Sequence, residues 1–145
     1  MMKIGSRLGM KSSNDLQEAV ARGSIVWLKL LPRVGNEQAG YRAALILSDG
    51  IIRSFAKSNL AFIVPITTKI KGNPFEVPVP VGDEAILLNG ERIGHPEIKI
   101  LKGVALVDHA KSVDLAARQA IVIGRADPDS DFYRQVADYA RAILA

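Results

Sequence analysis

The stretch "GNEQAGYRAALILS", residues 35–48, joins a polar loop to a strongly apolar run. Its glycines mark the loop. The run from residue 41 onward is apolar almost throughout, which predicts a strand buried on both faces. Arg42 stands at the start of this strand and Glu37 in the loop before it. Because charged side chains are rarely buried without a partner, the junction between loop and strand is a candidate functional site.

Other short apolar segments surround this stretch, separated by proline- and glycine-containing turns. Residues 74–80 alternate in polarity and contain prolines, which is typical of an edge strand. Asn89 and Gly90 predict a hairpin turn within residues 82–100. The remaining strands are predicted at residues 24–30, 60–68, 99–110 and 118–126. Short strands with frequent turns predict a mostly β fold, a small and strongly curved antiparallel sheet or barrel with flanking helices.

Helices are predicted at the two ends of the chain. Residues 127–145 predict a C-terminal helix, with Asp127 as its cap and Pro128 in its first turn. Residues 1–22 are predicted to be a partly helical N-terminal extension, and residues 23–145 a single domain. The apolar stripe expected along the C-terminal helix is Phe132, Val136, Tyr139 and Ile143.

Composition excludes several kinds of site. The chain of 145 residues contains no cysteine, which excludes disulfides, thiolate zinc sites and cysteine nucleophiles. It contains only two histidines, far apart in sequence, so we expect no metal site. We find neither a signal peptide nor an apolar run long enough to span a membrane, which predicts a soluble cytoplasmic protein.

The net charge of +4 is unevenly distributed. Residues 50–72 contain arginine and lysine but no acid, whereas acids outnumber bases in residues 73–101. A basic segment of this kind favours a phosphate-rich partner. A solvated charged face is an equally good interpretation of the charge pattern by itself.

Polar residues stand where several predicted strands begin or end. Arg42 begins one strand and Thr67 and Thr68 end another, while Asp108 interrupts a third apolar run. An arginine fork and a threonine hydroxyl can hold a phosphate, and a carboxylate can take a proton from a nucleophile. Such a set is sufficient to cleave RNA through its own 2′-hydroxyl, without a metal if the arginine supplies the positive charge.

Each of these residues also has a structural interpretation, which spacing alone favours. Arg42 could pair with Glu37 at the surface. Thr67 and Thr68 could simply favour a strand or a turn, and Asp108 could cap the turn that follows it.

Three blocks of sequence, "GSIVWLKLLPRVGNEQAGYRAALILS", "FIVPITTKIKGNPFEVPV" and "GVALVDHAKSVDLAAR", cover most of residues 23–118. In this order, and with the elements EQAGYR, VPITT and KGNPFEV, they resemble the MazF/PemK (Kid) toxins of type II toxin–antitoxin systems. The resemblance implies an SH3-like or CcdB-like barrel with a C-terminal helix, acting as a homodimer. It also implies an mRNA interferase, a metal-independent and sequence-selective endoribonuclease for single-stranded RNA that needs no cofactor. The resemblance further implies that an acidic antitoxin binds and inhibits it.

The resemblance assigns roles to individual residues. Arg42, Glu37, Thr67 and Asp108 match the family's catalytic positions, with the general base left open between Glu37 and Asp108. The accompanying RNA contacts are predicted at Lys57, Thr68, Lys69, Lys71, Lys111 and Ser112.

The sequence departs from the family pattern at several positions. Ala43 replaces the proline that usually follows the arginine, while Leu106 and Asn36 replace a second arginine and a histidine of the Kid branch. The roles should therefore follow the MazF branch more closely. Residues 82–101 also form a longer connection than is usual, an expected insertion. Two alternatives to a nuclease stay open: a gyrase poison like CcdB, and a degenerate antitoxin-binding relative without activity.

Overall fold

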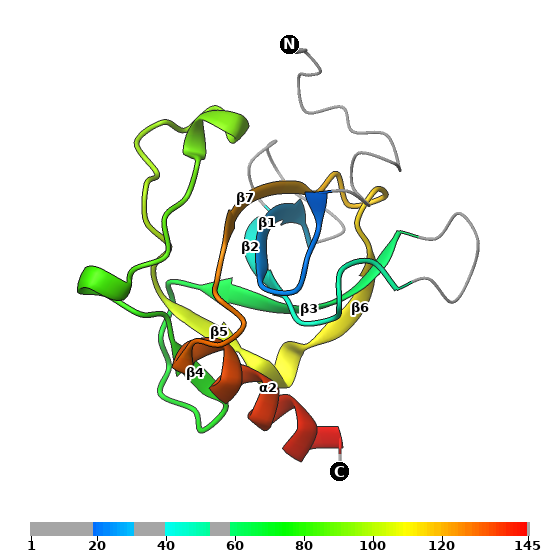
Figure 1. The fold of residues 1–145 in the computed structure, drawn as a ribbon, viewed down its shortest axis with the longest axis vertical. Coiled ribbons are helices and arrows are strands. Elements are labelled where there is room, and N and C mark those ends of the chain that lie inside the picture. Colours follow the sequence, from blue (N-terminus) through cyan, green and yellow to red (C-terminus); the bar gives the residue numbers. More distant parts are fainter. Residues whose placement is uncertain (1–18, 31–39, 53–58, 145) are drawn as a thin grey trace.

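The structure, a computed structural model, describes residues 19–30, 40–52 and 59–144. Its centre is a ladder of three antiparallel strands, β1 (Ser24–Lys29), β2 (Tyr41–Ile46) and β3 (Leu60–Thr67). All three were predicted from their β-branched and apolar runs, and their existence is confirmed. Figure 1 shows them curving around a common centre.

Four shorter strands complete a seven-stranded sheet of order β4-β5-β3-β2-β1-β7, with β6 also paired to β3. They are β4 (Glu76–Pro78), β5 (Val104–Leu106), β6 (Lys111–Asp114) and β7 (Ile121–Arg125). Strand β4 lies at the end of the order, so the predicted edge strand is confirmed. The mostly β, strongly curved antiparallel architecture is as expected.

Strand β2 is buried on both faces, as its continuous apolar run predicted. Ala43 and Leu45 enter one hydrophobic cluster, which also contains the C-terminal helix. Ala44 and Ile46 enter a second cluster on the other face of the sheet. Alternate residues of a strand point to opposite faces, so one uninterrupted apolar run supplies both cores.

Strand β3 contains a proline in its interior, at a position that a central strand normally excludes. Residues Leu60 to Ile63 pair with β6, and Ile66 and Thr67 pair with β5. Pro65 therefore lies where β3 passes from one partner to the other. A residue without an N–H group is tolerated there because no partner strand lies opposite it on that side.

The C-terminal helix is α2 (Asp131–Leu144), and it begins later than its predicted cap. The Ser130 hydroxyl accepts the N–H of Tyr133 at 3.2 Å, which is the capping interaction. Asp127 instead accepts the N–H of Asp129, in a turn before the helix. The capping role predicted for Asp127 is therefore wrong, because serine at residue 130 is the nearer acceptor for the first turn.

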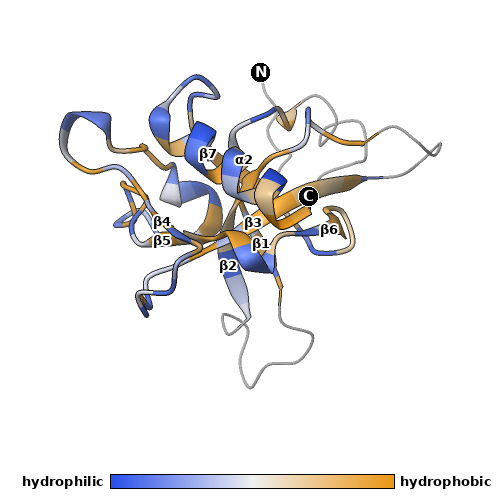
Figure 2. Ribbon diagram, turned by 90° about the horizontal axis from the view of Figure 1, so that it is seen from below, coloured by the Kyte–Doolittle hydropathy of each residue, from blue (hydrophilic) through white to orange (hydrophobic). Residues whose placement is uncertain are grey.

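The buried face of α2 differs in part from the predicted stripe. Phe132 and Val136 are buried as expected, together with Tyr133 and Ala140, but Ile143 is 42% exposed. Figure 2 shows the resulting bands of hydrophilic and hydrophobic residues along α2. Two further contacts hold the helix, the Tyr133 hydroxyl donating to the Leu47 carbonyl at 2.8 Å and the edge-on packing of Tyr139 against Phe75.

The segment between β4 and β5 contains two short 3₁₀ helices, η2 (Gly82–Glu84) and η3 (Gly90–Ile93). The hairpin turn predicted at Asn89 and Gly90 is wrong, because Asn89 has a φ of −102° and the tight turn requires a positive value. Tertiary contact decides the conformation instead: the Asn89 N–H donates to the Ile123 carbonyl of β7 at 2.8 Å.

The strand predicted at residues 99–110 is shorter than expected. It ends at Leu106, and η4 (Val107–His109) follows, so that Asp108 lies in a 3₁₀ turn before β6, a strand that was not predicted. None of the helices in the described part of the chain has both the length and the apolar character needed to cross a membrane.

Candidate active site

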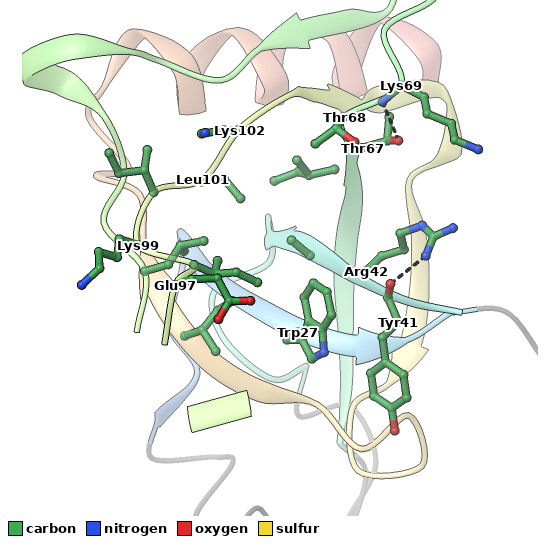
Figure 3. Close-up of a pocket in the computed structure, with 16 residues that line it drawn as sticks. Trp27, Tyr41, Arg42, Thr67, Thr68, Lys69, Glu97, Lys99, Leu101 and Lys102 are labelled. Carbon is green, nitrogen blue, oxygen red and sulfur yellow. Dashed lines mark hydrogen bonds between the residues drawn. The ribbon is translucent and has the colours of Figure 1, made fainter. Parts of the chain in front are cut away.

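A pocket of about 580 Å³ opens beside the start of β2 and the end of β3. Ala43 pairs with Ile66 across these strands, so the neighbouring Arg42 and Thr67 also lie opposite each other. Thr68 and Lys69 follow on the same rim. Figure 3 shows these side chains along one side of the pocket, as the sequence predicted for strand ends meeting at one rim.

Arg42 is exposed on this rim, and a hydrogen bond to the neighbouring residue restricts the orientation of its side chain. Its Nη1 donates to the carbonyl of Tyr41 at 2.7 Å. The Tyr41 ring stacks on Trp27 with centroids 6.3 Å apart, and its hydroxyl donates to the carboxamide oxygen of Gln119. Within the described residues no carboxylate forms an ion pair with Arg42. The guanidinium therefore keeps donors for an anion.

Thr67 is positioned by a close approach of two strands. Its hydroxyl accepts the N–H of Lys69 at 3.1 Å, which leaves the hydroxyl proton able to donate to a ligand. Gly103, with a φ of +110°, lies just before β5, and a Cβ there would stand 2.1 Å from the Thr67 carbonyl oxygen. Only glycine permits this approach.

Residues Glu97 to Lys102 form the far wall of the pocket. Trp27, Leu88 and Ile123 also line the pocket, and its floor is largely apolar. Sequence reasoning did not find Glu97 or Lys102, because Glu97 stands in the expected insertion, Lys102 directly follows it, and neither belongs to a motif. Only the tertiary path of residues 82–102 brings them to the site.

Glu97 is the carboxylate on the far wall. A hydrogen bond from its own backbone N–H, followed by one from His95, lowers the pKa of Glu97 below its usual range. The Nδ1 of His95 lies 3.1 Å from Oε2 of Glu97. The carboxylate is thus held ionised at the mouth of an otherwise cationic and apolar pocket.

Other predicted site residues lie outside this pocket. Asp108, in η4, has its carboxylate 3.9 Å from Nε2 of His109. Lys111 pairs with Ile63 on β3, roughly 13 Å from Thr67 at about 3.3 Å per residue. Ser112 is one residue further away along β6. Glu37 and Lys57 fall outside the described residues, so their predicted roles stay predictions.

The KGNPFEV element has a structural role. The Glu76 carboxylate accepts the N–H groups of Lys71 and Gly72 at 3.0 and 2.8 Å, and Asn73 accepts that of Phe75. These bonds fix the turn that leads into β4. Lys71 is exposed but does not line the pocket. Among the described residues no group of three or more His, Asp or Glu side chains is placed to hold a metal ion.

The profile of a family described as PemK-like, MazF-like toxins of type II toxin–antitoxin systems matches residues 21–143. The chain belongs to this family. A curated family member, the endoribonuclease toxin MazF of Escherichia coli K12, is 36% identical over 107 residues, which are 74% of this chain and 79% of that relative.

Solved structures of family members share the fold. A crystal structure of MazF from Deinococcus radiodurans is 31% identical with a TM-score of 0.61, covering 86% of this chain and 94% of that one. A MazE–MazF crystal structure from the same organism is 27% identical with a TM-score of 0.59, covering 86% and 93%. The MazF-like fold expected from the EQAGYR, VPITT and KGNPFEV elements is confirmed.

Proposed function

We propose that this family member is the toxin of a type II toxin–antitoxin system and cleaves single-stranded RNA as a sequence-selective endoribonuclease in the cytoplasm. The observation that carries the proposal is the position of Arg42 opposite Thr67 on the rim of a pocket with an aromatic and apolar floor. Two anion-binding groups beside a surface for bases fit a nucleotide chain. The relation to the E. coli endoribonuclease toxin supports the same activity.

In this proposal the substrate supplies its own nucleophile. The Arg42 guanidinium and the Thr67 hydroxyl hold the scissile phosphate, and Lys69 adds positive charge. The 2′-oxygen attacks phosphorus and loses its proton to a base, and the bond to the 5′-oxygen breaks as that oxygen gains a proton. The products are a 2′,3′-cyclic phosphate and a 5′-hydroxyl.

Arg42 would act mainly in the transition state. Charge accumulates on the phosphorane oxygens, and a fixed cationic donor stabilises it without a metal ion. Glu37 and Asp108 are the candidate bases, and the proposal favours Glu37 because Asp108 lies outside the pocket. Bases beside the cleavage point would stack on Trp27.

The proposed partner is an acidic antitoxin segment, and the proposed assembly is a homodimer. A solved complex of relatives contains MazE with MazF. A flexible acidic chain with apolar anchors suits this pocket because Arg42 and Lys69 on the rim and Lys102 on the far wall accompany an apolar floor. Such a chain loses entropy when it orders, and it compensates by covering a large surface.

The activity is tested with a mixed-sequence RNA in EDTA, followed by mapping of both new ends. We expect cleavage with a 2′,3′-cyclic phosphate and a 5′-hydroxyl. An oligonucleotide with a 2′-deoxy sugar at the cut position should resist. Equal cleavage of the deoxy substrate would show that the 2′-hydroxyl is not the nucleophile, and the absence of all cleavage would contradict the proposed function.

A further inference from the structure

The far wall of the pocket carries one acid among bases. Glu97, Lys99 and Lys102 are its charged residues, and all three are exposed. In Figure 3 the Glu97 carboxylate is directed toward the Trp27 ring, whereas the Lys99 ammonium is directed away from the pocket. In the same view Arg42 lies on the other side of the Trp27 ring from Glu97, and its guanidinium donates to the Tyr41 carbonyl.

This wall is held in place by bonds to strand β7 and within itself. Arg92 donates to the Val122 carbonyl at 2.8 Å, and Leu88 forms a bridge with Gly124. The N–H of Ile98 donates to the His95 carbonyl at 2.9 Å. At Gly90, a Cβ would lie 2.1 Å from that carbonyl oxygen, so the segment closes on itself tightly. These hydrogen bonds and close contacts therefore fix the segment of chain that carries Glu97.

The carboxylate can only accept hydrogen bonds from a ligand. Its Oε2 already accepts from His95 Nδ1, which must carry the proton in this contact. A carboxylate has about four acceptor positions, so both oxygens can still receive donors from a base. A ligand edge with two adjacent donors is the best complement, because each donor can bond to one of the two carboxylate oxygens.

Among the RNA bases only guanine presents such an edge. Its N1–H and its N2 amino group are adjacent donors, which match the two oxygens of a carboxylate. Adenine and cytosine each place a ring-nitrogen acceptor beside their amino group, and uracil flanks its N3–H with two carbonyl oxygens. Each of those acceptors would be repelled by the negative charge of Glu97, which would weaken binding of the base.

We infer that Glu97 is a specificity-determining residue that reads the Watson–Crick edge of a guanine lying on Trp27, next to the phosphate held by Arg42 and Thr67. The inference rests on the proposed function, since it assigns one base of the RNA substrate. It gives the segment of residues 82–102 a role in choosing the cleavage sequence.

The first test is binding of an RNA oligonucleotide that carries a 2′-deoxy sugar at the cut position and therefore cannot be cut there. Four oligonucleotides differ only in the base at the pocket position, and a fifth has inosine, which lacks the N2 amino group. We expect wild type to prefer guanine to inosine on the order of tenfold. Glu97→Gln should lose this preference, because its amide presents one donor and one acceptor. Glu91→Gln, an exposed acid of the same segment outside the pocket, should keep it.

The second test maps cleavage sites in a random-sequence RNA. Cut sites of the wild type should be enriched in guanine at one position beside the scissile bond, and Glu97→Gln should cut at sites without that enrichment. An unchanged site profile in Glu97→Gln, or a wild type that binds guanine and inosine equally, would overturn the inference while leaving the nuclease proposal intact. A wild type that never cleaves RNA but shows a Glu97-dependent preference for guanine would support the inference and contradict the nuclease.

Discussion

At the scale of single residues, the position of Arg42 accounts for a cation at the start of a buried strand. The strand becomes buried only from Ala43 onward, and Arg42 itself is exposed on the rim. The guanidinium donates to the carbonyl of Tyr41, whose ring stacks on Trp27. The sequence pattern that placed charge beside a buried run thus marks the point where the strand reaches the pocket.

Replacing Arg42 tests its role directly. Arg42→Ala should lower the cleavage rate by on the order of a hundredfold or more, because one fixed cationic donor to the transition state is lost. RNA binding should weaken far less. Arg42→Lys should also be slow, because an ammonium cannot fork two phosphate oxygens. Single-turnover cleavage and binding of the deoxy substrate measure the two effects.

Arg134→Ala is the matched control, since Arg134 is exposed on α2 and does not line the pocket. It should leave both measurements unchanged. A cleavage rate near wild type in Arg42→Ala would remove this residue from the mechanism, and an unfolded variant would mean that its role is structural.

The carboxylate of Glu97 should titrate below the usual range for glutamate, because its backbone N–H and His95 both bond to the charged form. Since its pKa is lower in the folded state, Glu97 stabilises the fold at and above the ordinary glutamate range, and this contribution is lost as the pH falls through the folded-state pKa. The effect on stability should be small at so exposed a group. Carboxyl NMR titration measures the pKa directly. His95→Ala should raise the pKa of Glu97 part of the way toward the ordinary glutamate value. An identical titration in that variant would contradict the assigned contact with His95.

At the scale of elements, the meeting of β3 with β5 sets one side of the pocket. Thr67 pairs with Val104, and the glycine before β5 passes directly against the Thr67 carbonyl. The exchange of β3 from β6 to β5 at Pro65 is what sends its last residues to the rim. The site therefore depends on a strand junction as well as on side chains.

Gly103→Ala should disturb this junction. A positive φ costs a residue with a Cβ about 1–2 kcal/mol, and the clash with the Thr67 carbonyl should add about 1–3 kcal/mol. Gly82→Ala is the control, because Gly82 also has a positive φ, of +70°, but its Cβ would meet no atom within 4 Å. Urea unfolding should therefore show a larger loss in Gly103→Ala, with slower cleavage in that variant alone. Equal losses in both would mean that the contact with Thr67 is not needed.

At the scale of the whole molecule, one surface is proposed to serve both RNA and antitoxin. The pocket is basic on its rim and apolar on its floor, which suits a nucleotide chain and an acidic peptide equally. Two ligands of similar chemistry for one site must exclude each other. In the proposed homodimer, each protomer would present one such pocket.

Competition between the two ligands is measurable. A synthetic acidic antitoxin segment should displace labelled deoxy RNA from the wild type in proportion to the occupancy of the segment. Arg42→Ala should weaken the binding of both ligands. A ternary complex in which RNA and antitoxin bind at full affinity would contradict a shared surface. Sedimentation at micromolar concentration tests the assembly, where a monomer would exclude the dimer.

The sequence by itself determined six of the seven strands, the burial of β2 on both faces, and Arg42 and Thr67 as residues of the rim. The continuous apolar run of β2 predicted burial on both faces because strand periodicity divides it between two cores, and the residues at strand ends pointed to Arg42 and Thr67. Local signals failed wherever a tertiary contact opposed them. Asn89 and Gly90 do not form a hairpin, because the Asn89 N–H bonds to β7 instead. No local sequence motif identifies Glu97, and only the path of its segment brings it to the pocket that Arg42 also lines. Local sequence encodes period and turn preference, whereas which distant segments share a pocket depends on contacts that exist only after the chain has folded.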